Sequence, residues 1–434
     1  MDNRRQSQTR DHVSVDVKED ALVSSIKDKM ETESTSISIS RVLDDLRKGN
    51  EVMYIPDKVS IGPFHHGNIL LKSMEDNKWR YMSALLNRKP NLELRLDRCV
   101  EVLRGLEHRA RLSYKGGVSL STDDFVQMML VDGCFIIELF LKYTFKNLRH
   151  RNDPIFSKHG MLFDVRCNMM LLENQIPYFI LQRLFQIVPI PKNCGQSLNE
   201  LAFRFFKRVI PGDLKVIQER FNHEGYHLLD LIHHCFLPTY PRVQPKEGGT
   251  RQDLDCATNL KKARIRFKKT RTKSLLDIKF VNGVLELPGL EVLTCTETLF
   301  RNLIALEQSH CDSAQHSFTS YAFLMGSLVC SEKDLKLLGK QQILIYEKDK
   351  RKEVSELFRK LCVAAKPMDS YYRGLFEQVN EFKRTHWLGF WQRLKHSHPK
   401  SPVALVVFTL AIMLIVLTFV GAFFSVLTFC LHHI

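Results

Sequence analysis

Hydrophobic residues between positions 41 and 237 recur at spacings of three and four along five long segments, which predicts amphipathic helices. Pro177 lies inside the fourth segment and predicts a kink or break, because proline has no main-chain N–H for a helical hydrogen bond. Two segments are apolar enough to resemble membrane spans, but the charged residues within them favour helices of a buried core. The five segments read MEDNKWRYMSALLNR, LELRLDRCVEVLRGLEHRARL, DDFVQMMLVDGCFIIELFLKYTF, DVRCNMMLLENQIPYFILQRLF and GYHLLDLIHHCFL.

The pattern changes after residues 238–257, which are rich in proline and glycine and which we interpret as a linker. Side-chain character then alternates in KKARIRFKK and on both sides of Asn282-Gly283 in LLDIKFVNGVLELPGL. Asn-Gly between alternating runs predicts a β-hairpin, because a type I′ turn needs positive φ at both central positions. Helical spacing resumes at ETLFRNLIALEQSH, YAFLMGSLVC and VSELFRKLC. We therefore expect a mainly α fold with a small β-hairpin element at about residues 261–288.

A last soluble helical pattern, from Tyr371 to His398, places apolar residues near one face and basic residues elsewhere. Two of the three tryptophans lie in it. The pattern suits a helix lying on a membrane surface, with Trp387, Phe390 and Trp391 at the interface. It suits equally a helix that packs against its own domain, and the sequence leaves both arrangements open.

Residues 403–431 contain no charged side chain. As a helix they would be about 43 Å long at roughly 1.5 Å per residue, against a hydrocarbon core of about 30 Å, so the pattern predicts a single C-terminal transmembrane helix. Lysine and arginine precede this segment, and the positive-inside rule then places residues 1–400 in the cytosol. The expected protein is single-pass and tail-anchored in the plasma membrane or an endomembrane.

The chain divides into three predicted regions. Residues 1–40 are polar and read as a flexible N-terminal extension without the apolar core of a signal peptide. Residues 41–398 form the domain, with a helical part at 41–237, the linker at 238–257, and the hairpin plus helices at 258–398. The transmembrane helix at 403–431 follows.

Composition adds two constraints. Hydrophobic residues make up 44% of the chain, enough for a sizeable core, and the net charge of +15 suits an anionic partner. The eleven cysteines are scattered without a C-x-x-C pair, which is typical of reduced thiols in a protein that faces the cytosol.

Several motifs occur in a characteristic order: SIGPFHHG, MMLVDGCFIIELF, LLENQIPYFIL, DIKFVNGVLELPGL with TETLFRNLIALEQ, and YAFLMGSLV. With the C-terminal apolar segment, this order resembles the plant domain of unknown function 247 family (DUF247, also UPF0481) over residues 41–431. The resemblance implies a plant source, a membrane-attached helical domain, no established enzymatic activity and, from members implicated in self-incompatibility in grasses, a recognition role for some members. The family usually has a glutamate and a glycine where this chain reads ATNLKKARIRFKK, so this member is locally more basic.

Two histidine pairs are candidate metal ligands or bases. His65 and His66 follow the SIGPF turn, and His233 and His234 precede Cys235. Neighbouring side chains in an extended segment point apart, and no second ligand pair accompanies either one. We therefore predict no metal and no cofactor, and we interpret SIGPFHHG as a structural corner.

Asp132, Glu138 and Glu173 are candidate acids or bases for a hydrolase. Charged residues on mainly apolar helices more often satisfy a main-chain group or a buried arginine. The chain lacks a phosphate-binding loop and a G-x-S-x-G motif. We predict no catalytic residues and no enzyme; the alternatives are a hydrolase acting on a membrane-associated substrate and a structural membrane scaffold.

A basic segment is the remaining candidate site, since no acidic residue occurs from Ala257 to Leu276. Its side chains suit contact with anionic lipid, whereas nucleic acid is disfavoured because no nucleic-acid-binding fold pattern is present. A solvated strand face is the alternative. The chain as a whole is expected to recognise an unknown protein partner, in signalling or cell recognition. The basic residues are Lys261, Lys262, Arg264, Arg266, Lys268, Lys269, Arg271 and Lys273.

Overall fold

The computed structural model describes the backbone of residues 39–210, 214–221, 223, 225–246, 253–309, 316–364, 370–396 and 402–432, and the statements below concern these residues. The part before the linker is helical, as its spacing predicts. Its elements are α2 (Asp44–Arg47), η1 (Glu51–Met53), η2 (Pro63–His65), η3 (Ile69–Leu71), α3 (Lys72–Leu86), α4 (Leu92–Leu112), α5 (Thr122–Thr144), η4 (Lys146–Leu148), α6 (Pro154–Ser157), α7 (Met161–Asn168), α8 (Tyr178–Ile187), α9 (Leu198–Phe206), α10 (Leu214–Arg220) and α11 (Leu228–Phe236).

Helix α5 is the centre of this half, with α3, α4, α8 and α9 packed around it. It begins directly after its N-cap residue Ser121, whose hydroxyl accepts a hydrogen bond from the Asp124 N–H at 3.1 Å. Apart from Asp132, Glu138 and Lys142 it is apolar on all sides, and it is buried from Phe125 to Lys142 except at Gln127. A helix without a polar face needs neighbours on every side. The prediction of a core helix rather than a membrane span is confirmed here.

The break predicted at Pro177 is confirmed and is wider than a kink. Helix α7 ends at Asn168, and α8 begins at Tyr178, directly after the proline. The turn between them is held by its own side chains, since the amide of Gln175 donates to the carbonyls of Met169 and Leu171 at 2.9 and 2.8 Å. These bonds satisfy main-chain acceptors that a continuous helix would have satisfied.

The predicted hairpin is present. Strands β2 (Lys279–Val281) and β3 (Val284–Pro288) pair antiparallel around Asn282 and Gly283, whose φ angles of 49° and 75° are those that the type I′ turn requires. Strand β1 (Arg266–Thr270) pairs with the other side of β3 in parallel, giving the order β1-β3-β2 with β1 at an edge. A second, two-stranded parallel sheet joins β4 (Leu290–Glu291) to β5 (Leu344–Ile345).

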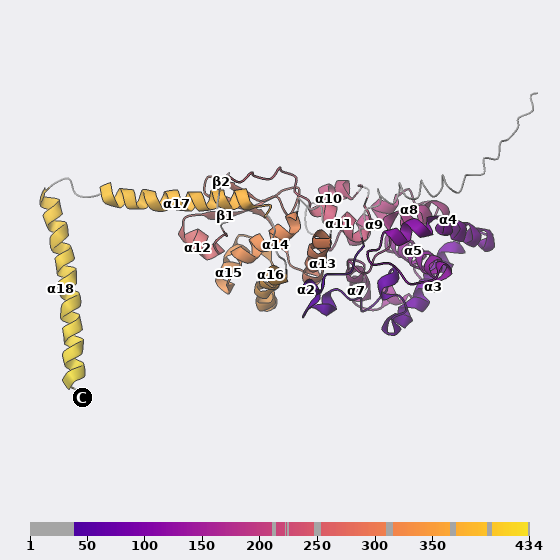
Figure 1. Ribbon diagram of the computed structural model, residues 1–434, viewed down its shortest axis with the longest axis horizontal. Helices are drawn as coiled ribbons and strands as arrows, with labels where there is room; N and C mark the ends of the chain where they lie inside the picture. Colours follow the sequence, from indigo (N-terminus) through magenta and orange to yellow (C-terminus); the bar gives the residue numbers. More distant parts are fainter. Residues whose placement is uncertain are drawn as a thin grey trace, which may run out of the picture.

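The two halves of the domain share one hydrophobic core, which extends from Ile39 to Val379. Helix α13 lies where they meet and contacts η1 and α11 on one side and α14 and α16 on the other. Figure 1 shows this arrangement, with α3, α4, α5, α8 and α9 at one end and α12, α14, α15 and α16 at the other. The helices after the linker are α12 (Ala257–Lys262), α13 (Thr296–Ser309), α14 (Ser317–Leu328), α15 (Glu332–Lys340), η5 (Lys348–Lys350) and α16 (Arg351–Ala364).

Helix α17 (Arg373–His396) packs its first turns against the domain. Tyr372, Leu375, Phe376 and Val379 are all buried in the shared core. Of the two arrangements left open by the sequence, packing against the domain is the one observed for this described part. The helix then runs outward, away from the rest of the domain (Figure 1).

The predicted single C-terminal transmembrane helix is not supported and is corrected here. Helix α18 (Pro402–His432) forms and stands apart from the domain in Figure 1. Across the described part of the chain, however, no helix has both the length and the apolar character needed to cross a membrane.

Candidate functional site

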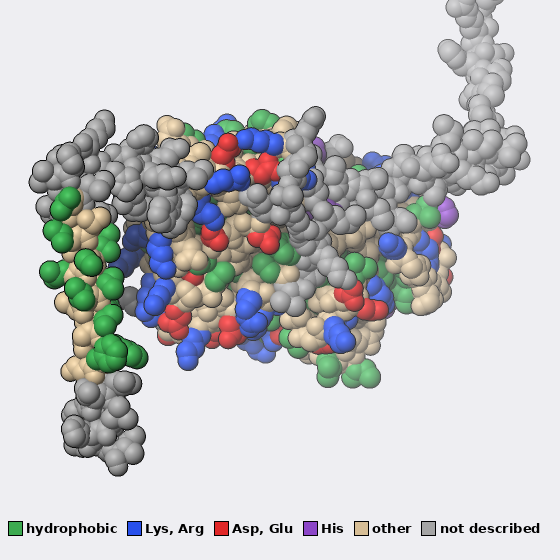
Figure 2. Space-filling model, turned by 60° about the vertical axis from the view of Figure 1, so that its left-hand side comes forward, with side chains coloured by type: hydrophobic (Ala, Val, Ile, Leu, Met, Phe, Trp, Pro, Cys, Tyr) green, Lys and Arg blue, Asp and Glu red, His purple; other side chains and the backbone are tan. Residues whose placement is uncertain are grey.

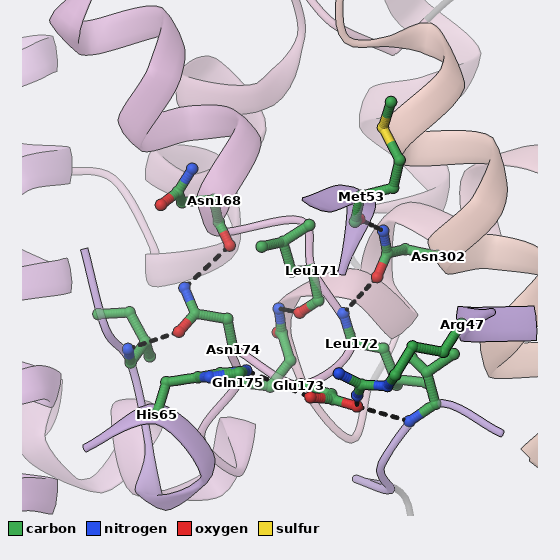
Figure 3. A network of polar contacts seen from close by, with 12 residues as sticks. Arg47, Met53, His65, Asn168, Leu171, Leu172, Glu173, Asn174, Gln175 and Asn302 are labelled. Atoms are coloured by element: carbon green, nitrogen blue, oxygen red, sulfur yellow. Dashed lines mark hydrogen bonds and ion pairs between the residues drawn. The ribbon is translucent and has the colours of Figure 1, made fainter. Parts of the chain in front are cut away.

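The LLENQIP turn between α7 and α8 is the centre of a buried polar network (Figure 3). Asn174 donates to the carbonyls of Val59 and Asn168 at 3.0 and 2.9 Å and accepts from the Ile61 N–H at 2.7 Å. The carbonyl oxygen of Gln175 accepts from the Tyr114 hydroxyl at 3.0 Å. One short turn thus holds main-chain segments that are far apart in the sequence.

Glu173, a candidate catalytic carboxylate, is an anchor of this network. Its fully buried carboxylate forms an ion pair with Arg47, accepts from the Val42 N–H at 2.7 Å, and lies 3.2 Å from His65 Nε2. Burial raises the pKa of Glu173, but the contacts with His65, Arg47 and Val42 outweigh burial and leave the pKa below its usual value. The charged Glu173 side chain therefore holds the segment that contains Val42 and Arg47 against the turn.

Asp132, the second candidate carboxylate, fixes the SIGPFHHG corner. It accepts from the Gly62 N–H at 2.8 Å and from Lys78 Nζ at 2.5 Å, and Lys78 also donates to the Ser60 carbonyl at 2.8 Å. Gly62 has φ of 76°, and a Cβ there would lie 2.3 Å from the Gln175 carbonyl oxygen, so no larger residue fits. The geometry supports interpreting SIGPFHHG as a structural corner.

Glu138, the third candidate, is buried on α5 and forms an ion pair with Arg88. Burial raises the pKa of Glu138 to about 7, although Arg88 and Lys142 oppose the shift. A raised carboxyl pKa is found in general acids. The Glu138 carboxyl lies among core residues of α5, and it does not line the cleft beside η4 and α9.

Asn302, which the sequence did not single out, joins this network to the second half of the domain. Its amide donates to the Met53 carbonyl at 2.9 Å, and its oxygen accepts from the Leu172 N–H at 2.9 Å (Figure 3). Asn302 is fully buried on α13. The pattern ETLFRNLIALEQ predicted the helix but gave no signal for these contacts.

The histidine pairs do not assemble a metal site. Within the described residues, no three or more His, Cys, Asp or Glu side chains converge on a common point. His66 is exposed, whereas His65 faces Glu173. On α11, His233 Nε2 lies 3.0 Å from Glu307, and burial lowers the pKa of His234.

The basic segment lies on α12, β1 and the turns that flank them. All eight of its lysine and arginine side chains are exposed. Lys268 forms an ion pair with Glu286 of β3 at 2.9 Å, and the other seven have no carboxylate partner among the described residues. Figure 2 shows lysine and arginine side chains gathered over the end of the domain where Figure 1 places α12 and β1.

The predicted membrane-interface residues Trp387, Phe390 and Trp391 lie in the outer part of α17, where the backbone is helical. Their side chains lie outside the described residues. Their role at a membrane interface stays a prediction.

A second basic surface, which sequence analysis missed, lines a cleft of about 600 Å³ beside η4 and α9. Its cations come from two stretches of chain, at 146–149 and 204–208, that lie more than fifty residues apart. Only folding brings them together. The basic side chains are Lys146, Arg149, Arg204, Lys207 and Arg208.

Comparisons with known proteins agree with the motif order. The family model DUF247, described as plant protein of unknown function, matches residues 39–417. The UPF0481 protein At3g47200 of Arabidopsis thaliana is 30% identical over 419 residues, covering 91% of this chain and 87% of the relative. A second UPF0481 protein of Arabidopsis thaliana, At3g02645, is 21% identical and covers 89% of both chains. No solved structure gives a significant match.

Proposed function

This chain belongs to the DUF247 family of plant proteins of unknown function, and from that premise we propose that it is a non-catalytic recognition module that binds an acidic, extended segment of another protein. The observation that carries the proposal is an exposed edge strand, β1, surrounded by basic side chains that have almost no acidic partners within the described chain. The candidate catalytic carboxylates support it, because each of them is engaged by contacts within the fold.

The side chains of β1 divide the strand into two faces. Arg266 and Lys268 are exposed on one face, whereas the other face carries the buried Phe267 and the exposed Lys269. An extended peptide with acidic side chains at alternate positions would place all of them on the face of Arg266 and Lys268. Two of the three cations of β1 therefore lie on the face that would meet these acidic side chains, and one of them, Lys268, also pairs with Glu286.

The backbone of β1 offers a matching set of hydrogen-bonding groups. The Arg266 N–H donates to the Gly283 carbonyl at 2.9 Å, so the parallel register directs residues 266, 268 and 270 toward β3. The main-chain groups of Phe267 and Lys269 point away from β3, to the side of β1 that pairs with no described strand. Strand addition at such an edge obtains affinity from the backbone and specificity from alternate side chains.

Anionic lipid is the other anionic partner considered for this segment. That interpretation depended on a C-terminal membrane span to bring the segment to a bilayer, and the described helices do not support the span. An edge strand adds main-chain hydrogen bonding that a lipid headgroup does not need. The observations therefore favour a peptide.

The proposal is tested by fluorescence anisotropy with the full chain and a labelled peptide in which Glu and Val alternate over about ten residues. We expect saturable binding that the substitutions Arg266→Gln and Lys268→Gln together weaken about tenfold. The matched control removes two equally exposed charges elsewhere, Lys146→Gln with Arg208→Gln, and should change the affinity less than about twofold.

A proline-interrupted peptide of the same charge separates strand pairing from simple charge attraction, because proline removes N–H groups from the pairing edge. It should bind much more weakly. Equal binding of both peptides, or equal loss in both double variants, would contradict the proposal. Binding to anionic vesicles but to neither peptide would favour lipid. If neither the peptides nor the vesicles bound, the proposal would be wrong, and the lysine and arginine side chains would serve to keep β1 from pairing with other strands.

A further inference from the structure

The cleft of about 600 Å³ next to α9 carries a strong excess of positive charge. Lys146 begins η4 and Arg149 follows it, whereas Arg204 lies on α9 and Lys207 and Arg208 lie in the turn after α9. Glu200 is the one carboxylate among the lining residues. Clefts of this size are typical of small-molecule sites.

The charges of the cleft are largely unneutralised within the described structure. Lys146, Lys207 and Arg208 have no ion pair with a described carboxylate. Arg204 donates to Gln196, with the amide oxygen turned toward it, at 3.0 and 2.7 Å. Glu200 accepts from the Ser197 N–H at 2.8 Å as part of the capping box of α9, so its charge is engaged at the helix end.

Contacts within the fold hold the Arg149 guanidinium in one position. Its Nε and Nη2 donate to the carbonyls of Lys142 and Tyr143 at 2.7 and 2.8 Å, and its guanidinium stacks on Phe156 at 4.2 Å from the ring centroid. These contacts are to neutral groups and leave the charge uncompensated. A positioned guanidinium loses little entropy when it binds an oxyanion.

A buried guanidinium, that of Arg166, lies over the rings of Tyr143 and Phe205 close to the cleft wall. Arg166 is 4% exposed, and its Nε and Nη2 have no hydrogen-bond partner in the described structure. Its guanidinium lies 5.3 Å from the ring of Tyr143, a residue that lines the cleft. Burial lowers the pKa of Arg166, and the charge of Arg208 lowers it further. The hydroxyl of Thr144, also on the cleft wall, is buried without a partner.

We propose that this cleft binds a compact organic anion that carries two or more phosphate monoesters. Several cations around one cavity favour a ligand with several oxyanions, and arginine matches phosphate through two parallel hydrogen bonds. Gln196 and Gln218 line the same cleft and suit hydroxyl groups of the ligand. An anion here would also compensate the buried charge of Arg166.

Such a ligand has two sources, a soluble polyphosphate and the headgroup of a phosphoinositide lipid. Isothermal titration of the full chain with inositol hexakisphosphate tests the first, and sedimentation with vesicles containing a polyphosphoinositide tests the second. Uncharged inositol and vesicles of neutral lipid are the blanks. Saturable binding in either arm supports the proposal, and the arm with the tighter binding identifies the source.

The test variant combines Lys146→Gln with Arg208→Gln, both exposed and without an ion pair to a described carboxylate, so folding should be retained; its thermal midpoint is measured first. We expect affinity to fall about tenfold or more. The matched control, Lys261→Gln with Lys262→Gln, removes the same charge from α12 and should change affinity less than about twofold. Absence of saturable binding, or an equal loss in both variants, would overturn the proposal.

The result is independent of the edge-strand proposal. The variant with Arg266→Gln and Lys268→Gln should bind the phosphate ligand like the wild type, and the cleft variant should bind the acidic peptide like the wild type. Either site can therefore fail without the other. If both double variants lost both ligands equally, the binding would reflect net charge alone, and both proposals would be wrong.

Discussion

At the scale of single residues, substituting Glu173 tests whether its carboxylate has a structural or a catalytic role. Replacing it with Gln removes the charge that pairs with Arg47 and faces His65. Breaking a buried ion pair costs about 3–5 kcal/mol, and we expect about 3 because the Arg47 side chain remains 23% exposed and can reach water. Urea denaturation of Glu173→Gln measures the loss. Glu101→Gln, which removes an exposed carboxylate on α4, is the control and should change stability by less than about 0.5 kcal/mol.

The same carboxylate predicts an acid limit of stability. Its pKa in the folded chain lies below the ordinary value of 4.5, so its contribution is present above pH 4.5 and is lost as the pH falls through the lower, folded value. Glu173→Gln should lose that part of the pH dependence. An unchanged melting temperature in the variant at neutral pH would contradict the structural role.

Glu138 should act in the opposite sense. Burial raises its pKa from 4.5 to about 7, so the folded chain binds more protons than the unfolded chain between these values, and stability falls as the pH rises through them. At full ionisation the cost is roughly 3 kcal/mol. In urea titrations between pH 5 and pH 8, Glu138→Gln should show a flatter stability profile than the wild type. Parallel profiles would show that Glu138 ionises normally in the fold.

At the scale of elements, the turn from α12 into β1 combines strain with charge. Arg264 adopts φ of 65°, the left-handed region in which glycine is favoured, and it ends α12 in the position where a glycine commonly occurs. Arg264→Gly should therefore stabilise the chain by about 0.5–1 kcal/mol, because the left-handed strain that it relieves exceeds the entropy that glycine adds to the unfolded chain. It should also weaken binding of the acidic peptide by about two- to fivefold, the effect of losing one exposed charge.

Thermal unfolding and peptide titration of the same Arg264→Gly sample check both effects. A gain in stability together with a loss of affinity would show that the arginine serves binding. Unchanged affinity would assign Arg264 to the solvated face and would weaken the edge-strand proposal.

The elements also show what the sequence can predict. Helices such as α4 and α5 and the hairpin at Asn282-Gly283 depend on local spacing and turn chemistry, so the pattern predicted them well. The parallel addition of β1 and the pairing of Glu173 with Arg47 join residues distant in sequence, and local periodicity carries no information about such partners. The cleft was missed for the same reason. The predicted transmembrane helix is the element that was wrong, since no helix of the described residues is both long and apolar enough to cross a membrane.

At the scale of the whole molecule, Asn302 should make the two halves unfold together. Asn302→Ala would leave the buried Leu172 N–H and Met53 carbonyl without partners, at a cost of about 2–3 kcal/mol. Pulse proteolysis in urea, with the fragments assigned by mass spectrometry, should show α5 and α13 becoming cleavable at one common urea concentration, lower in the variant than in the wild type. Loss of α13 before α5 would show that the shared core does not couple the halves.

The central claim is that β1 pairs with an acidic strand, and amide hydrogen exchange at single-residue resolution tests it most directly. The full chain is measured with and without the alternating Glu and Val peptide at saturation. Strand pairing predicts slower exchange at the N–H groups of Phe267 and Lys269, which face the open edge, with little change at Arg266 and Lys268. Peptide binding that leaves Phe267 and Lys269 exchanging at their original rates would contradict the account.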